Sequence, residues 1–330
     1  METIGILYPG AMGSSLARTL SSRLPHLTLL TSLSNRSAST VSRAESSGLT
    51  NVPLSELVSR SDIILSILPP SSATDLAKEI ISHLPSNRSK PLIYADLNAV
   101  SPGTTSKISA LLLEHDIVFL DGSVLGLPAT ETFDPKIYLS CRAEFESSLN
   151  EVADVLSGGS PGKGLAIHTM PGAGEGAASA LKMCYGGINK GYVGLASLLV
   201  MAANAHSKGT ADALLDEFAD SKTAALEGFS RSFPDMIGKA YRWVGEMEEI
   251  SSFINTSLSG NDSSDLAREN ARKVAETFQG LAKVFQRVAD DVRDDEEEEQ
   301  GDSAGKEEVD KLLDWGKRGG EAVKRKKQGI

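Results

Sequence analysis

Along the first 170 residues, short apolar runs alternate with longer segments in which apolar residues recur at helical spacing. The first run is Ile4 to Leu7, and the segment 14–24 after it predicts a helix. The nearly continuous apolar run at 62–68 is typical of a central parallel strand that is covered on both faces. Further strands are predicted at 27–30, 92–96, 117–121, 136–141 and 165–168, and further helices at 72–84 and 104–114. This alternation predicts a doubly wound, mostly parallel α/β sheet.

After residue 172 the pattern changes, and no segment has the period of a strand. Helical spacing covers four segments, which are 174–205, 211–230, 237–254 and 263–292. We therefore predict a Rossmann domain over residues 1–168 and an all-α domain over 169–330. The acidic stretch 290–305 is predicted to be disordered or a solvated helix end, and the basic residues 324–327 a solvated terminus.

The turn after the first strand, residues 8–13, has the character of a phosphate-binding loop. A strand, a glycine turn and a helix start direct backbone N–H groups and the positive end of the helix at a pyrophosphate. The dinucleotide fingerprint has three spaced glycines, of which Gly10 and Gly13 are present, whereas Tyr8 occupies the first position. We predict that the turn binds a dinucleotide through Tyr8, Pro9, Gly10, Ala11, Met12 and Gly13.

The residues just past the second strand decide which dinucleotide fits. An NAD site usually has an acid there for the ribose hydroxyls, whereas an NADP site has arginine and small hydroxyls for the 2′-phosphate. The chain has no Asp or Glu between Gly13 and Glu45, and it offers Asn35, Arg36 and Ser37 at this place. We predict NADP as the cofactor, with NAD the weaker alternative.

Other cofactor contacts are predicted where later strands end, because parallel sheets bind ligands at the carboxyl ends of their strands. Leu68 and Pro69 follow the strand at 62–68, and Asn98 follows the strand at 92–96.

A second group of chemically capable residues lies in the glycine- and alanine-rich segment 172–190. Lys182 is surrounded there by small and apolar residues, and an ammonium group in such surroundings is suited to proton transfer. Tyr185 and Asn189 follow on the same helical face. We predict that these three residues are catalytic.

Composition excludes several other classes of protein. A net charge of −11 argues against nucleic-acid binding, which needs clustered positive charge. The apolar run 192–205 is too short to span a bilayer, and the cysteines and histidines lack the spacing of metal ligands. We expect a cytoplasmic protein that acts on a small molecule, with no metal, no nucleic acid and no membrane partner.

With these motifs, the chain resembles the β-hydroxyacid dehydrogenase superfamily, which includes 6-phosphogluconate dehydrogenase, and within it the branch with a distinct helical C-terminal domain. The turn 10–13 matches the family's cofactor turn, residues 96–102 the loop beside the nicotinamide, and residues 241–250 the signature of the branch. Lys182 falls on the family's catalytic lysine. The resemblance implies a homodimer through the helical domains and a substrate site at Ser123, Val124, Leu125, Gly126, Trp243 and Met247, with core packing as the alternative role of Trp243.

The chain departs from the family at Tyr8, at Leu125 and Leu127 in the substrate loop, and at Gly186, where the family has asparagine. Gly186 and the apolar Leu125 and Leu127 favour a larger or less polar substrate than the usual hydroxyacid. The predicted function is hydride transfer between NADP and a small alcohol or carbonyl compound, with Lys182 as general acid/base. An imine reductase and a non-catalytic NADP-binding regulator are the alternatives.

Overall fold

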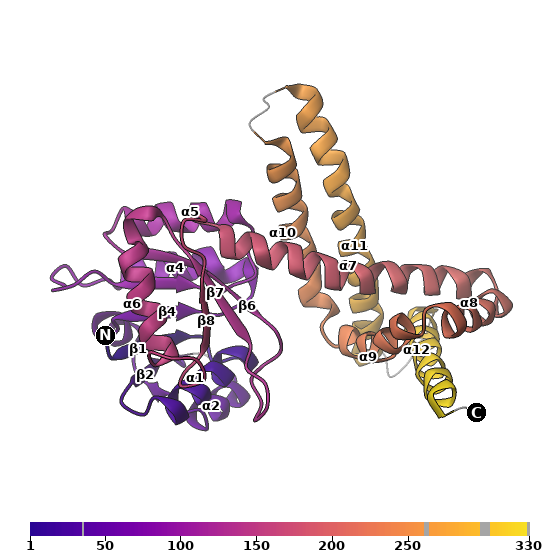
Figure 1. The fold of residues 1–330 in the computed structure, drawn as a ribbon, viewed down its shortest axis with the longest axis horizontal. Helices are drawn as coiled ribbons and strands as arrows, with labels where there is room; N and C mark the ends of the chain where they lie inside the picture. The colour runs from indigo at the N-terminus through magenta and orange to yellow at the C-terminus, as the bar shows by residue number, and fades with distance from the viewer. Residues whose placement is uncertain (35, 261–263, 298–303, 329–330) are drawn as a thin grey trace. The chain divides into compact units, whose positions relative to one another are not determined.

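The computed structural model describes residues 1–34, 36–260, 264–297 and 304–328, without the side chains of 293–297 and 304–306. The chain forms two compact units, Met1–Cys184 and Tyr185–Ile330, so that the division falls within the long helix α7 (Ala177–His206). Figure 1 shows an α/β unit at the N-terminal end of the chain and a helical unit after it.

The first unit contains one sheet of eight strands in the order β3-β2-β1-β4-β5-β6-β7-β8. Its strands are β1 (Thr3–Leu7), β2 (Thr28–Thr31), β3 (Thr50–Asn51), β4 (Ile63–Ser66), β5 (Ile93–Asp96), β6 (Val118–Leu125), β7 (Lys136–Ser140) and β8 (Ala166–Thr169). The strands from β3 to β6 are parallel, β7 runs antiparallel to β6, and β8 is parallel to β7. The first six strands therefore have the order that defines dinucleotide-binding sheets.

Helices cover both faces of this sheet (Figure 1). The helices are α1 (Ala11–Arg23), α2 (Ala38–Glu45), α3 (Leu54–Arg60), α4 (Ala73–Ser82), α5 (Pro102–Leu113) and α6 (Glu146–Ser157), with single 3₁₀ turns η1 (Pro70–Ser72) and η2 (Ala143–Phe145). Buried side chains of α1, α2 and α6 form one core with the sheet, and those of α3, α4 and α5 form the other. The predicted doubly wound, mostly parallel sheet is confirmed.

Several short elements of this unit are absent from the sequence-based prediction. Helix α2 is an example, because it buries only Ala44 and therefore has almost no apolar period. It forms because Ser37 caps it, with the Ser37 hydroxyl accepting a hydrogen bond from the Thr40 N–H at 3.3 Å.

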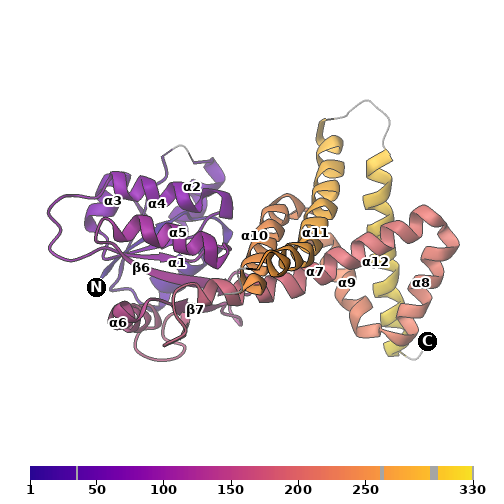
Figure 2. The same ribbon diagram turned by 90° about the horizontal axis from the view of Figure 1, so that it is seen from above.

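The second unit is helical throughout its described residues, as predicted. After α7 it contains α8 (Lys208–Ser221), α9 (Thr223–Ile237), α10 (Ala240–Ser259), α11 (Asp265–Glu297) and α12 (Ala304–Gln328). Helices α10 and α11 lie side by side along much of their length (Figures 1 and 2). Within the described ranges, no helix is long and apolar enough to cross a membrane.

The prediction of one helix over 211–230 is wrong, because Lys222 leaves the helical conformation and separates α8 from α9. The break allows Phe218 of α8 and Phe229 and Phe233 of α9 to form an aromatic cluster with Trp315 of α12. Apolar spacing continues across the break, so periodicity alone does not reveal it.

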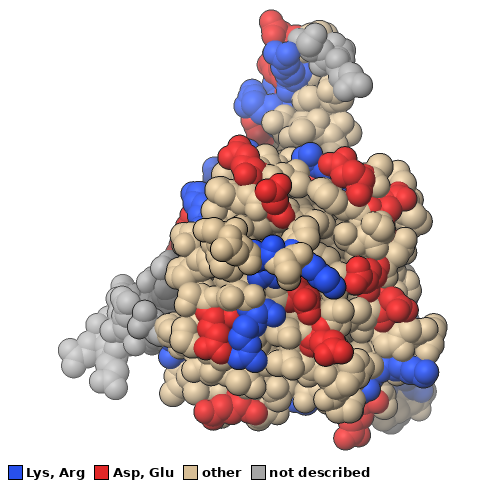
Figure 3. Space-filling model, turned by 90° about the vertical axis from the view of Figure 1, so that its left-hand side faces the viewer, with Lys and Arg blue, Asp and Glu red and all other residues tan. Residues whose placement is uncertain are grey.

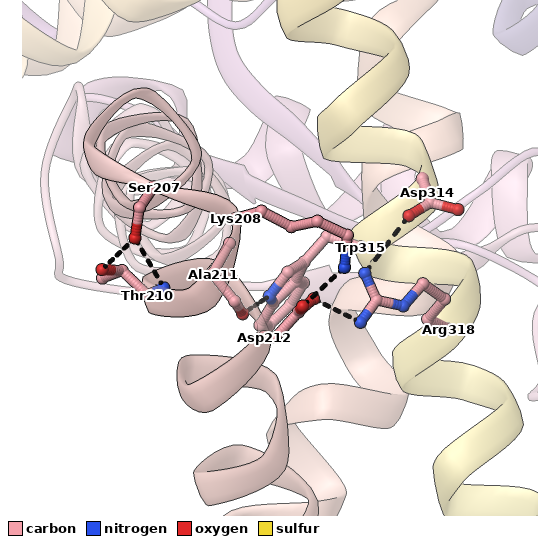
Figure 4. A network of polar contacts seen from close by, with 8 residues as sticks. All are labelled: Ser207, Lys208, Thr210, Ala211, Asp212, Asp314, Trp315 and Arg318. Atoms are coloured by element: carbon pink, nitrogen blue, oxygen red, sulfur yellow. Dashed lines mark hydrogen bonds and ion pairs between the residues drawn. The ribbon is translucent and has the colours of Figure 1, made fainter.

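Polar contacts also hold α12 on α8 (Figure 4). The indole N–H of Trp315 donates to the carbonyl of Ala211 at 3.0 Å, and Arg318 forms an ion pair with Asp212 at 2.6 Å. The basic end predicted as a solvated terminus belongs to α12, where the Lys326 ammonium donates to the last carbonyls of α8. Of the acidic stretch 290–305, residues 290–297 are the end of α11, and 298–303 lie outside the described residues.

Candidate functional site

The turn between β1 and α1 has the geometry of a pyrophosphate cradle. A Cβ atom on Gly13 would lie 2.3 Å from the carbonyl oxygen of Tyr8, so only glycine lets α1 start this close to β1. A Cβ on Gly10 would meet no atom of the described residues within 4 Å, so they leave the turn open on that side. No side chain caps α1, which leaves its first backbone N–H groups available for an anion. These are the roles of the second and third glycines of the fingerprint.

The turn lies where the strand order reverses, between β1 and β4, and a cavity of about 310 Å³ opens at this place. Ligands of doubly wound sheets bind at this switch point. Of the predicted cofactor residues, the cavity is lined by Tyr8, Gly10, Arg36, Leu68 and Pro69. Pro9, Ala11, Met12 and Gly13 belong to the adjoining turn, whereas Asn35 lies outside the described residues.

Arg36 lies over the ring of Tyr8, with 3.5 Å between the guanidinium carbon and the ring centroid. Ser37 is occupied as the cap of α2. Arg36 therefore lies at the cavity, whereas the Ser37 hydroxyl caps the adjacent helix α2.

Asn98 is 2% exposed, and both ends of its side-chain amide are used within the protein. Its oxygen accepts from the Leu68 N–H at 2.7 Å, and its nitrogen donates to the Ser66 hydroxyl at 2.8 Å. The amide therefore fixes the loop after β4 that lines the cavity. The role of Asn98 as a direct cofactor contact stays a prediction.

A row of buried polar residues crosses the carboxyl edge of the sheet. Ser66, Asp96, Asp121 and Ser140 are register partners on β4, β5, β6 and β7. All four are buried. Sequence reasoning missed this row as a unit, although each acid directly follows an apolar strand segment.

Both carboxyl groups of this row are electrostatically perturbed. Burial, with the neighbouring charge of Asp121, raises the pKa of Asp96 to about 7, against the lowering effect of hydrogen bonds from Asn98. One carboxylate oxygen of Asp96, Oδ2, has no hydrogen-bond partner among the described residues. Burial also raises the pKa of Asp121, although this carboxylate accepts hydrogen bonds from Ser179 and Ser140.

The contact between Asp121 and Ser179 holds the start of α7 against β6. The hydroxyl of Ser179 donates to Asp121 Oδ1 at 2.5 Å, and its backbone N–H donates to Oδ2 at 3.0 Å. One turn further along α7, the Lys182 ammonium donates to the carbonyl of Val124 at 2.6 Å. The predicted catalytic lysine and the predicted substrate loop are therefore in direct contact.

The rest of the substrate loop surrounds this contact. Ser123 is completely buried, and in the part of the chain that the structure describes its hydroxyl has no hydrogen-bond partner. Leu125 is half-buried, and Gly126 is exposed with a φ of 122°, a backbone conformation that favours glycine.

Four predicted site residues belong to the helical unit. Tyr185 and Asn189 are exposed, and the Asn189 amide donates to the Tyr185 carbonyl. Trp243 packs edge-on against Phe285, in line with its alternative role in the core. Met247 is completely buried, so the described residues leave it no surface for a substrate. The structure therefore supports a packing role for Met247 rather than a substrate contact.

Two family models match parts of the chain. Residues 3–93 match the family described as NADP oxidoreductase, coenzyme F420-dependent, and residues 205–288 match a domain of unknown function, DUF1932. A comparison with curated proteins finds no match.

Solved structures with a similar fold cover most of the chain. One is a conserved protein of unknown function, whose structure is described as similar to the 3-hydroxyacid dehydrogenases (24% identity, TM-score 0.55, covering 87% of this chain and 97% of that one). Another is a conserved hypothetical protein from Sinorhizobium meliloti 1021 (20%, TM-score 0.57, 96% and 97%). A third is 3-hydroxyisobutyrate dehydrogenase from Salmonella typhimurium (13%, TM-score 0.58, 86% and 100%).

The chain thus has an NAD(P)-binding Rossmann domain followed by a helical C-terminal region, the fold of the 3-hydroxyacid dehydrogenases. The predicted resemblance is confirmed at the level of fold. More particularly, residues 205–288 of its helical region match the model of the DUF1932 domain.

Proposed function

We propose that the protein is an NADP-dependent oxidoreductase that transfers a hydride between the nicotinamide and a small alcohol or carbonyl substrate. The observation that carries this proposal is the position of Lys182. Its ammonium group is held by the Val124 carbonyl at the end of β6, in the same unit as the glycine turn.

The residues of the first unit fit the cofactor. The open side of Gly10 and the first N–H groups of α1 would hold the pyrophosphate, and Arg36 would hold the 2′-phosphate. The bound nicotinamide would supply or accept the hydride, and the protein would contribute orientation and proton transfer.

The Nζ atom of Lys182 would donate a proton to the substrate oxygen or accept one from it. The bond to Val124 fixes where the ammonium group lies, and Asp121 fixes the helix turn that carries it by binding Ser179. Leu125 is half-buried and Leu127 exposed, so the loop beside this ammonium group presents apolar surface. This favours a substrate that is larger or less polar than a short hydroxyacid.

The test compares Lys182→Ala with wild type in NADPH oxidation against a panel of carbonyl compounds and imines. We expect turnover to fall at least about 100-fold, the usual contribution of a general acid, while NADPH binding followed by fluorescence stays unchanged. Lys163→Ala is the matched control, because Lys163 is an exposed lysine of the same unit. Equal turnover of Lys182→Ala and wild type would remove Lys182 from the mechanism.

The same panel separates the alternatives. Turnover of imines but not of carbonyl compounds would identify an imine reductase, and NADPH binding without turnover of either class would favour a regulator.

The proposal also includes a cytoplasmic location, which subcellular fractionation tests. On the face shown in Figure 3, basic and acidic side chains are interspersed, and such a face does not attract nucleic acid as a continuous basic patch would.

We also propose a homodimer through the helical unit. Along α7, large apolar side chains are exposed on successive turns, at Ile188, Tyr192, Leu195 and Leu199. An apolar groove of about 660 Å³ lies between α7 and α11 in the same unit. A continuous apolar face of this kind is typical of a protein interface. Light scattering after size exclusion should give twice the chain mass of 34.9 kDa, and a mass of one chain would contradict the dimer.

A further inference from the structure

Tyr8 occupies the position at which the dinucleotide fingerprint has its first glycine. Among the described non-glycine residues only Asp116 has a positive φ, so the backbone at Tyr8 does not need glycine. Its N–H donates to the Ile67 carbonyl at 3.0 Å, and its carbonyl accepts the Gly10 N–H at 2.8 Å. The turn is formed in spite of the substitution, and what the substitution adds is an aromatic ring.

That ring is the support for Arg36. The guanidinium carbon lies 3.5 Å from the ring centroid, within the range of a cation–π contact. The Arg36 backbone N–H is bound to the Leu33 carbonyl, and the Leu33 N–H to the side chain of Asn51. Arg36 is otherwise exposed, and a long exposed side chain loses rotamer entropy when a ligand fixes it. Contact with Tyr8 already restricts the Arg36 side chain in the free protein, so less rotamer entropy is lost when a ligand binds.

The charges around the cavity favour an anion on the side of Arg36. Thr40 lines this side, and the Arg43 guanidinium donates to the Thr40 hydroxyl at 3.0 Å. Another part of the lining, the α4 wall, carries Asp75 and Glu79. A phosphate is therefore attracted to the Arg36 wall and repelled by the α4 wall.

We propose that Tyr8 is a specificity-determining residue, whose ring holds Arg36 flat at the cavity so that the guanidinium selects nucleotides with a 2′-phosphate. The planar guanidinium keeps its donor edge for the phosphate while one of its faces rests on the ring. This inference rests on the proposed function, which requires a nucleotide in this cavity.

The experiment measures calorimetric dissociation constants of adenosine 2′,5′-bisphosphate and 5′-AMP with the full chain. The quantity compared is the ratio of the two constants, which isolates the contribution of the 2′-phosphate. The variants are Tyr8→Phe, Tyr8→Gly, Arg36→Ala and the double variant Tyr8→Gly/Arg36→Ala. Tyr8→Leu replaces Tyr8→Gly if circular dichroism shows that the glycine variant does not fold.

We expect wild type and Tyr8→Phe to prefer the bisphosphate equally, because only the ring is required. Tyr8→Gly should lower the preference by about 3- to 30-fold, the range of cation–π contacts. In the Arg36→Ala background the same change should lower it no further, since Tyr8 acts through Arg36.

An unchanged preference in Tyr8→Gly, or an equal loss with and without Arg36, would overturn the role of Tyr8 while leaving the proposed function intact. If wild type bound neither these fragments nor NADPH, the proposed function would fail together with this inference.

Discussion

Replacing Asp96 with asparagine removes an ionisable group with a raised pKa from the buried polar row. Asp96 is 1% exposed, and burial together with the charge of Asp121 raises its pKa to about 7 from the usual 3.8. Asparagine has nearly the same shape and keeps an oxygen for the Asn98 N–H, but it does not ionise.

The sign of the effect follows from the direction of the pKa shift. A carboxyl group with a raised pKa binds its proton more tightly in the folded state, so its contribution to stability is complete below pH 3.8 and is lost as the pH rises through about 7. With these two pKa values, the free energy of unfolding falls by about 2 kcal/mol between pH 5.5 and pH 8.

The assay is native-state hydrogen exchange of the β5 amides at these two pH values, corrected for the intrinsic exchange rates. Tryptophan fluorescence does not serve, because Trp243 and Trp315 both belong to the helical unit. We expect the opening free energy of wild type to fall by about 2 kcal/mol more than that of Asp96→Asn. Burial also raises the pKa of Asp121 in wild type, and Asp121 is present in both proteins, so only the difference between them is used.

Asp116→Asn is the control, because Asp116 is an exposed carboxylate of the same unit. It should show the pH dependence of wild type. Identical pH dependence of Asp96→Asn and wild type would refute the electrostatic argument.

Two further predictions concern packing and a buried hydrogen bond. Gly13→Ala places a methyl group 2.3 Å from the Tyr8 carbonyl oxygen and should destabilise the protein by about 1–3 kcal/mol, whereas Gly10→Ala meets open space and should weaken NADPH binding at an unchanged melting temperature. Equal melting temperatures of the two variants would contradict this assignment of roles. Trp315→Phe removes the bond to the Ala211 carbonyl, and denaturation followed by circular dichroism should show a loss of about 1–3 kcal/mol. An unchanged unfolding curve would show that this bond does not stabilise the helical unit.

Much of the first unit could be predicted from the sequence, because its strands are apolar and its turns carry local signals. The spacing of Gly10 and Gly13 indicated the cradle, and the geometry at Gly13 gives the physical reason for that spacing. The absence of acids between Gly13 and Glu45 drew attention to Arg36, which the structure places at the cavity.

Contacts between distant segments could not be predicted in the same way. The row from Ser66 to Ser140 exists only because of strand register, which no local pattern reveals. The bond between Lys182 and Val124 depends on how α7 docks on β6. The burial of Met247 depends on the packing of the helical unit, so a resemblance in sequence was insufficient to assign its role.

The most direct test of the central claim is a parallel titration of the purified full chain with NADPH and NADH, followed by nucleotide fluorescence. We expect one binding site per chain and tighter binding of NADPH, because the described lining of the cavity at the glycine turn includes Arg36 and has acids only on its α4 wall. Tighter binding of NADH would contradict the 2′-phosphate site but leave an oxidoreductase. Binding of neither nucleotide would contradict the account as a whole.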